Sequence, residues 1–189
     1  MKIFTVGHST RSWPEFLQLL QKYAISLVID VRAFPSSQRF PHFNREYLAR
    51  ELFGAGISYW WLGRELGGYR RREEGLGENS PNKGWQREGY RIYADYMLSE
   101  PFAAAVDQVI QAASRQTATL LCAERLYFRC HRQLIADYLT WKGQEVWHIE
   151  DLTVVKRHVL HRLAREEEGR LIYPPPQLPL IEKDSVEKD

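Results

Sequence analysis

The feature that most constrains this chain is a regular alternation of short apolar runs with amphipathic helical patterns. Residues 27–31 are Leu-Val-Ile-Asp-Val, a β-branched and almost continuously apolar run. Such a run is typical of a strand that is covered on both faces in a parallel sheet. Comparable runs predict further strands at 2–6, 57–61, 118–123 and 145–149.

Helical patterns occupy most of the intervals between these runs. The first is marked by Ser12 as the N-cap, Pro14 in the first turn and Glu15 as the partner of a capping box. The predicted helices span 13–23, 44–54, 87–98, 101–115, 130–142 and, as a last basic helix, about 154–167. This order predicts a three-layer, Rossmann-like α/β fold, with a mainly parallel sheet of about five strands and helices on both faces.

A chain of 189 residues is long enough to bury one core without metals or disulfides. We expect a single α/β domain over residues 1–150. Residues 151–189 are expected to form a C-terminal helix and a Pro-rich, charged tail packed on that domain or extending from it. Residues 63–84 contain six glycines and lack apolar periodicity, which predicts a long irregular loop.

Composition narrows the functional classes. The formal net charge of +2 is too small to indicate polyanion binding by itself, but 19 of the 26 basic residues are arginine, which suits carboxylates and phosphates. Two cysteines cannot form a disulfide framework, and no segment approaches the ~18 apolar residues of a membrane span. The apolar start is too short for a signal peptide. We therefore expect a cytoplasmic protein with reduced thiols and no membrane partner.

Polar side chains stand at the end of every predicted strand. They are His8, Ser9 and Thr10 at the end of the first strand, Asp30 and Arg32 at the second, Arg64 and Glu65 near the third, Cys122 and Glu124 at the fourth, and His148, Glu150 and Asp151 at the fifth. A single such residue is more often a turn or cap residue. Because parallel strands open on one edge of the sheet, where ligands bind, the group as a whole predicts an active site.

The densest polar segment is 122–132. A strand ends at Cys122 and a helix is predicted to begin near Cys130, which places Cys130, His131 and Arg132 in its first turn. Free N–H groups and the positive end of the helix dipole favour an anion there, and both would lower the pKa of a thiol. The segment predicts a pocket for phosphate or carboxylate.

A thiolate phosphatase or sulfurtransferase is one more specific interpretation. It requires a cysteine after a strand, a glycine-rich loop around an oxyanion, and an arginine six residues on. Here the sixth residue after Cys122 is Phe128, Arg129 comes one position too late, and the loop lacks glycine. The pattern therefore disfavours this mechanism.

Zinc held by Cys122, Cys130, His131 and a remote histidine such as His8 is a second specific interpretation. Paired Cys-x-x-Cys spacings are absent. Adjacent side chains at 130 and 131 would also diverge if both lay on a helix. We accordingly expect no metal and no cofactor, and Cys122 alone would fill a buried strand end.

The chain resembles a known family in several ordered motifs. They are Val6-Gly7-His8-Ser9, Val28-Ile29-Asp30-Val31-Arg32 with Pro35 and Ser36, Gly56-Ile57 with Tyr59, Leu66-Gly67-Gly68, and Cys122-Ala123-Glu124 followed by Cys130-His131-Arg132. Together they are similar to the family called domain of unknown function 488, over about residues 1–150. The resemblance implies a single α/β domain of bacterial or archaeal type and a pocket, but no particular reaction. It implies that His8, Ser9, Asp30, Arg32, Glu124, Cys130, His131 and Arg132 are the shared polar residues.

An enzyme acting on an anionic substrate, a nucleotide or nucleic-acid component, is our first hypothesis. Arg32 and Arg132 would clamp the anion, with Ser9 and Cys130 beside it. Catalysis would use Glu124 or Asp30 as general base and His8 or His131 as acid. Nucleophilic attack by Cys122 or Cys130 is a variant of the same hypothesis.

A non-catalytic module that binds nucleotides or single-stranded nucleic acid is the second hypothesis. Residues 32–91 carry eleven Arg/Lys against seven Glu, interleaved with aromatic residues on which bases can stack. A third interpretation makes Asp30–Arg32 and Glu124–Arg132 structural ion pairs, whose loss would cost stability rather than activity.

Overall fold

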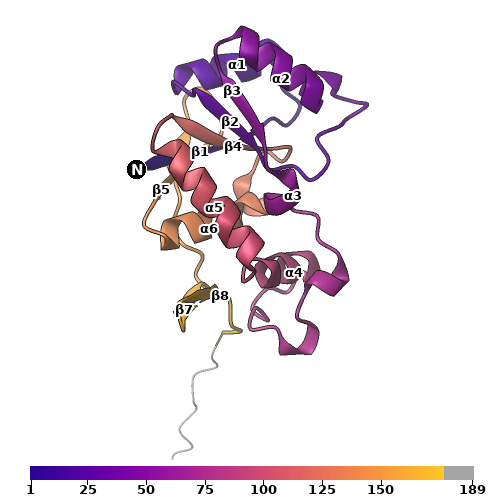
Figure 1. Ribbon diagram of the computed structural model, residues 1–189, viewed down its shortest axis with the longest axis vertical. Helices are drawn as coiled ribbons and strands as arrows, with labels where there is room; N and C mark the ends of the chain where they lie inside the picture. Colours follow the sequence, from indigo (N-terminus) through magenta and orange to yellow (C-terminus); the bar gives the residue numbers. More distant parts are fainter. Residues whose placement is uncertain (177–189) are drawn as a thin grey trace, which may run out of the picture.

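The computed structural model describes residues 1–176 and confirms the predicted three-layer α/β architecture (Figure 1). Its main sheet has six strands in the order β3-β2-β4-β1-β5-β6. The strands are β1 (Lys2–Gly7), β2 (Leu27–Asp30), β3 (Ser58–Trp61), β4 (Ala118–Cys122), β5 (Glu145–Ile149) and β6 (Val155–Arg157). The first five are parallel to their neighbours, and β6 pairs with β5 in the antiparallel direction.

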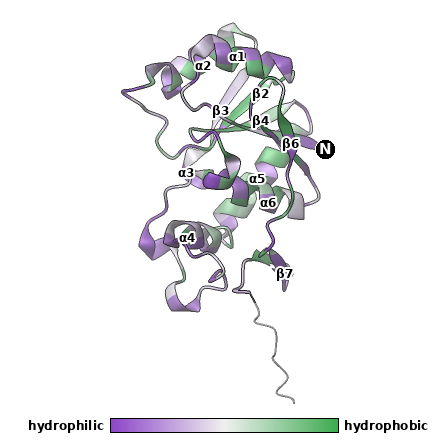
Figure 2. Cartoon of the chain, turned by 180° about the vertical axis from the view of Figure 1, so that it is seen from behind, coloured by the Kyte–Doolittle hydropathy of each residue, from purple (hydrophilic) through white to green (hydrophobic). Residues whose placement is uncertain are grey.

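Helices cover both faces of this sheet. They are α1 (Trp13–Lys22), α2 (Arg45–Gly54), α3 (Gly63–Leu66), α4 (Glu88–Tyr96), α5 (Glu100–Ala113) and α6 (Arg132–Trp141). The central strands β2 and β4 are coloured hydrophobic in the cartoon of Figure 2. In β2, Val28 packs in the cluster beneath α1 and α2, whereas Ile29 packs in the cluster beneath α5 and α6. Both faces of β2 are therefore buried, which explains its continuous apolar sequence.

The start of α1 has the predicted capping box. The Ser12 hydroxyl accepts from the backbone N–H of Glu15, and the Glu15 carboxylate accepts from the backbone N–H of Ser12 at 2.7 Å. Two of the otherwise free N–H groups at this helix end are thereby satisfied.

The segment 63–84 is more ordered than its sequence predicts. It contains α3 and two 3₁₀ turns, at 72–74 and 77–79. The buried carboxylate of Asp95 in α4 organises it, because Ser80 donates to Asp95 at 2.6 Å and Asn82 donates at 2.8 Å. Glycines permit the turns, and a single buried acceptor fixes the path.

The last basic helix predicted at about 154–167 is wrong. Residues there form β6, an irregular stretch, and β7 (Arg165–Glu167), which pairs with β8 (Arg170–Ile172). Two residues with positive φ, Glu168 at 50° and Gly169 at 72°, make the hairpin turn between β7 and β8. Edge pairing with β5 and burial of His158 outweigh the helical pattern.

The described chain reaches Pro176, and Tyr173 is fully buried against the domain. The charged tail from Glu182 to Asp189, expected to fray or form a peripheral arm, lies outside the described residues. Among residues 1–176, no helix combines the length and hydropathy that crossing a bilayer requires.

Candidate functional site

The carboxyl ends of β1, β2 and β4 meet at one edge, because these strands lie side by side in the order β2-β4-β1. Directly beyond them, the backbone N–H of His8 donates to the carbonyl of Cys122 at 2.9 Å. A Cβ atom at Gly7 would collide with the backbone of Glu124 and lie 2.8 Å from the Cα of Arg125. Only glycine therefore lets the segments after β1 and β4 approach so closely.

Asp30 and Arg32 form a buried, two-pronged ion pair. The Arg32 Nη2 lies 2.6 Å from Asp30 Oδ2, and Nε lies 2.9 Å from Oδ1. The hydroxyl of Tyr59 donates to Asp30 Oδ2 at 2.8 Å. Burial lowers the pKa of Arg32, but hydrogen bonds and charge from Asp30 outweigh it and the pKa is raised. With Arg32 only 7% exposed, its donors serve the protein itself.

His8 is held in one tautomer beside this pair. Its Nε2 lies 3.2 Å from Arg32 Nη1, which can only donate, so Nδ1 carries the proton and donates to the Ser9 carbonyl at 2.9 Å. Burial and the Arg32 charge lower the pKa of His8 to about 4. The ring stacks on Phe43 at 4.1 Å. His8 is thus a neutral imidazole at pH 7.

Arg132 makes several hydrogen bonds to the loop between β4 and α6. Its guanidinium donates to the carbonyls of Glu124 and Arg125, to Cys130 Sγ at 3.5 Å, and to Thr5 Oγ1 at 3.4 Å. The side chain is 1% exposed. The structure brings Arg132 to the predicted edge, but its donors point at this loop rather than at open space.

Two further predicted residues lie at the rim of the edge. Glu124 is exposed, and its Oε1 accepts from the backbone N–H of Leu126 at 2.9 Å. It forms no ion pair with Arg132, whose guanidinium contacts the Glu124 carbonyl instead. Ser9 is half-buried and adopts a φ of 53°.

Cys122, Cys130 and His131 form a compact cluster of sulfur and nitrogen donors at the edge. One donor atom from each lies within 4.8 Å of the others. Both cysteines are free and buried. Hydrogen bonding from the Cys122 thiol, assisted by His131 and Arg132, lowers the pKa of Cys130 well below its usual value. The same contact with Cys130, together with burial, raises the pKa of Cys122.

The helix start explains why these side chains converge. The sequence predicts Cys130 in the first turn of a helix, whereas α6 begins at Arg132. Cys130 is extended, with φ −134° and ψ 150°, and only His131 turns into helical geometry. The expected divergence of residues 130 and 131 is therefore wrong, and Cys130 Sγ lies 3.5 Å from His131 Nδ1.

A buried chain of polar side chains leads away from this edge, and most of its members were missed. Thr5 Oγ1 lies 2.8 Å from His148 Nδ1, and His148 Nε2 lies 2.9 Å from His158 Nδ1. His158 Nε2 in turn lies 2.8 Å from Asp137. The sequence signal that could have identified them is a polar residue inside an apolar pattern, as with Thr5 in a strand and Asp137 in a helix. Sequence analysis identified only His148, which lies near the end of a predicted strand.

An open pocket of about 400 Å³ lies beside the same loop. It is lined by Gly84, Trp85, Gln86, Arg87, Tyr90, Phe128, Arg129, His161, Arg162 and Leu163. Trp85 stacks on His161 at 4.5 Å and on Tyr90 at 5.1 Å. The lining has three guanidiniums and no carboxylate, and sequence analysis identified none of these arginines as a binding residue.

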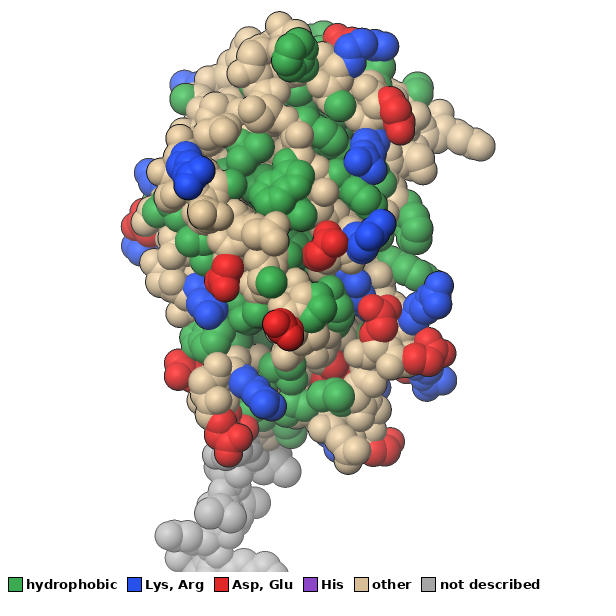
Figure 3. Space-filling view, viewed as in Figure 1, with side chains coloured by type: hydrophobic (Ala, Val, Ile, Leu, Met, Phe, Trp, Pro, Cys, Tyr) green, Lys and Arg blue, Asp and Glu red, His purple; other side chains and the backbone are tan. Residues whose placement is uncertain are grey.

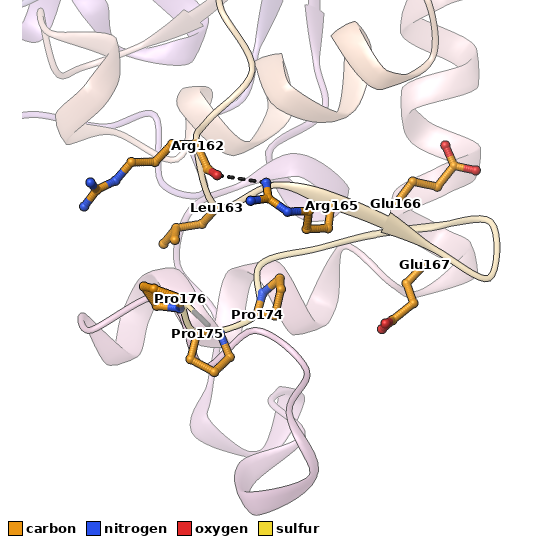
Figure 4. A pocket seen from close by; sticks show the side chains of 8 residues that line it. All are labelled: Arg162, Leu163, Arg165, Glu166, Glu167, Pro174, Pro175 and Pro176. Atoms are coloured by element: carbon orange, nitrogen blue, oxygen red, sulfur yellow. Dashed lines mark hydrogen bonds between the residues drawn. The ribbon is translucent and has the colours of Figure 1, made fainter. Parts of the chain in front are cut away.

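A second pocket of about 570 Å³ lies at the β7–β8 hairpin (Figure 4). Its arginines, Arg162 and Arg165, share the lining with Glu166 and Glu167, and Pro174 to Pro176 close one side. This pocket shares Arg162 and Leu163 with the first, and its mixed charge makes it the weaker candidate for an anion.

One of three comparisons with known proteins finds a match, and it covers all the quoted motifs except Val6-Gly7-His8-Ser9. No curated protein and no solved structure matches the chain. The family described as domain of unknown function DUF488 matches residues 12–139, which contain β2, β4 and the start of α6. That match covers more than half of the chain, and the protein belongs to the DUF488 family.

Proposed function

We propose that this protein is an enzyme acting on an anionic substrate that carries an aromatic base, a nucleotide or a nucleic-acid component. The substrate binds in the pocket of Arg87, Arg129 and Arg162. The observation that carries the proposal is the charge of this pocket, which holds three guanidiniums and no carboxylate. Among residues 1–176, none of these side chains forms an ion pair or donates a hydrogen bond, so all three are available to phosphate oxygens.

The aromatic residues of the pocket support a base-bearing substrate. Trp85 and Tyr90 have polar atoms that are buried without a hydrogen-bond partner in the described chain, namely the indole Nε1 and the phenol oxygen. A bound heterocycle would stack on an exposed aromatic ring of the lining. Phe128 is 49% exposed at the pocket wall, next to Arg129.

This pocket replaces the clamp predicted from the sequence. The hydrogen-bond donors of Arg32 and Arg132 are occupied by Asp30 and by loop carbonyls, respectively. These arginines therefore hold the segments after the strands in place instead of binding the substrate. Asp30 is equally engaged. None of the catalytic residues predicted from sequence lines the pocket. His131 is the nearest of them along the chain, two residues after Arg129, and its ring nitrogens contact Cys130 and the Val31 carbonyl.

A non-catalytic module for single-stranded nucleic acid is the alternative, favoured by the exposed Phe128 beside two arginines. It needs a longer basic track than one pocket. On the face shown in Figure 3, basic and acidic side chains are interspersed rather than gathered into such a track. Three arginines in a single pocket match one small anion better than a strand, and we favour the small-substrate enzyme.

The test compares binding and turnover of nucleoside mono- and diphosphates with those of oligonucleotides. Arg129→Ala should weaken nucleotide binding about tenfold or more, as expected from losing one charge-assisted contact. Arg115→Ala, on an exposed helix end remote from the pocket, is the matched control. Nucleotide binding without turnover would support the non-catalytic module. Equal nucleotide affinity of Arg129→Ala and Arg115→Ala would reject the pocket.

A further inference from the structure

We infer that Cys122, Cys130 and His131 form a binding site for a thiophilic divalent metal ion, zinc by chemical preference, with one coordination position left open. This inference goes beyond the proposed function, because metal binding can be measured without any substrate. It rests on the arrangement of the donor atoms, on the orientation of His131, and on the close packing around the imidazole ring.

The donor spacing matches tetrahedral zinc. Zinc binds thiolate sulfur at about 2.3 Å and imidazole nitrogen at about 2.0–2.1 Å, so two such ligands at a tetrahedral angle lie about 3.5 Å apart. Cys130 Sγ and His131 Nδ1 are 3.5 Å apart. The Cys122 sulfur completes a group in which all three atoms lie within 4.8 Å of one another.

His131 presents the correct nitrogen. Its Nε2 lies 3.0 Å from the backbone carbonyl of Val31, which can only accept, so Nε2 carries the proton. In the neutral ring, Nδ1 then keeps its lone pair, and this atom faces Cys130. A histidine ligand that donates its other ring N–H to a carbonyl is the usual outer-sphere arrangement at protein metal sites.

The ring of His131 is seated by close packing. A Cβ atom at Gly68 would collide with the imidazole, closest to Nδ1 and 2.7 Å from Cγ. Tyr93 also meets the ring edge-on, at 5.4 Å between centroids. The imidazole therefore points at the two sulfurs without rearrangement.

The surroundings suit bound thiolates. Arg132 Nε lies 3.5 Å from Cys130 Sγ and can donate to a metal-bound sulfur. Within residues 1–176, no fourth Cys, His, Asp or Glu joins the cluster. The cluster therefore supplies three protein ligands and leaves the fourth position of a tetrahedral ion to a non-protein ligand.

Two other uses of the same side chains are weaker. A disulfide between Cys122 and Cys130 would leave the orientation of His131 without a purpose. A thiolate nucleophile paired with His131 would need access to substrate, and the Cys130 side chain is only 5% exposed. Both alternatives become outcomes of the test.

The experiment titrates Co²⁺ into chelator-treated, reduced, full-length protein and follows thiolate-to-metal charge transfer together with the visible bands of tetrahedral Co²⁺. We expect one ion per chain, displaced by Zn²⁺. Cys122→Ser, Cys130→Ser and His131→Ala should each lose the tetrahedral signature, and His131→Cys should restore it. His42→Ala, a histidine outside the cluster, should leave it unchanged.

A second pair of variants avoids the ligands altogether. Gly68→Ala should displace the His131 ring and weaken Co²⁺ binding about 10–100-fold, the range seen when an outer-sphere partner is lost. Gly89→Ala is the matched control, because a Cβ there meets nothing within 4 Å. Circular dichroism confirms that each variant is folded.

Three results would overturn the inference. They are the absence of charge transfer in reduced protein, equal Co²⁺ affinity of Gly68→Ala and Gly89→Ala, and unchanged tetrahedral bands in His131→Ala. Loss of both free thiols on exposure to air, with no metal bound when reduced, would assign the pair to a disulfide. Failure of nucleotide binding with normal Co²⁺ binding would reject only the proposed function.

Discussion

The Nε2 atom of His158 lies 2.8 Å from Oδ1 of Asp137, and both side chains are almost completely buried. Asp137 belongs to α6, and His158 follows β6. The carboxylate also accepts from the hydroxyl of Tyr173 at 3.0 Å. One acidic side chain thus ties the segment after β5 to the α/β domain.

The direction of hydrogen-bond donation along this polar chain follows from the carboxylate of Asp137 at its end. With Asp137 as acceptor, His158 donates through Nε2 and accepts through Nδ1, so His148 donates to it through Nε2. His148 Nδ1 then accepts from the hydroxyl of Thr5. Every member of the chain then has a hydrogen-bond partner.

Removing the anchor of this chain should destabilise the fold. Asp137→Asn places amide hydrogens where the carboxylate accepts from His158 and Tyr173, and we expect a loss of about 3 kcal/mol in the free energy of unfolding. Urea denaturation measures it. The exposed Asp107→Asn is the control and should change stability by less than about 0.5 kcal/mol. Similar values for the two variants would contradict the anchoring role.

Stability should fall on acidification through the histidines. Burial, with help from the charges of His158 and Arg132, lowers the pKa of His148 from 6.5 to about 2. Below pH 6.5, His148 therefore binds a proton in the unfolded chain but stays unprotonated in the folded chain. The stabilisation is complete above that pH and is lost as the pH falls, by up to about 1.4 kcal/mol per pH unit.

The proton uptake can be assigned with one variant. His148→Phe should reduce the number of protons taken up on unfolding between pH 6.5 and 4.5 by about one. The contribution of His8, whose pKa burial and Arg32 lower to about 4, should remain. Urea denaturation across this pH range gives the slope, and an unchanged slope would count against a neutral, buried His148.

The Asp30–Arg32 pair should act as one structural unit. A double-mutant cycle with Asp30→Asn and Arg32→Met should give a coupling free energy of about 2 kcal/mol or more, because each single change leaves a buried partner unpaired. The exposed pair Arg50–Glu51 serves for comparison and should couple by less than about 0.5 kcal/mol. Equal coupling free energies in the two cycles would mean that Asp30 does not hold Arg32, which would then be free to bind the anion.

Close backbone approach should make Gly7 irreplaceable. In Gly7→Ala the new Cβ meets the backbone of Glu124 and Arg125, so β1 and the β4–α6 loop must separate at a cost of about 3 kcal/mol. Gly54→Ala, in α2 with nothing near its Cβ, should instead gain about 0.5 kcal/mol. Thermal denaturation of both variants compares the two sites, and a well-tolerated alanine at Gly7 would refute the close approach.

Local pattern was sufficient for most of the fold. The apolar run at 27–31, the capping box at Ser12 and the glycine-bounded helices lie in short windows, so strand and helix order followed from periodicity. The helix predicted at 154–167 failed because its pattern is weaker than edge pairing with β5 and the burial of His158. That competition involves residues far apart in sequence.

The sequence by itself determined which polar residues stand at the strand ends, because parallel strands must open on one edge. Only the tertiary structure decided what each does. Arg32 and Arg132 turn inward because buried acceptors surround them, whereas Arg129 is left facing a pocket. Cys130 and His131 converge because the helix starts two residues later than its pattern indicates. Those outcomes depend on backbone angles and long-range contacts, which no local pattern specifies.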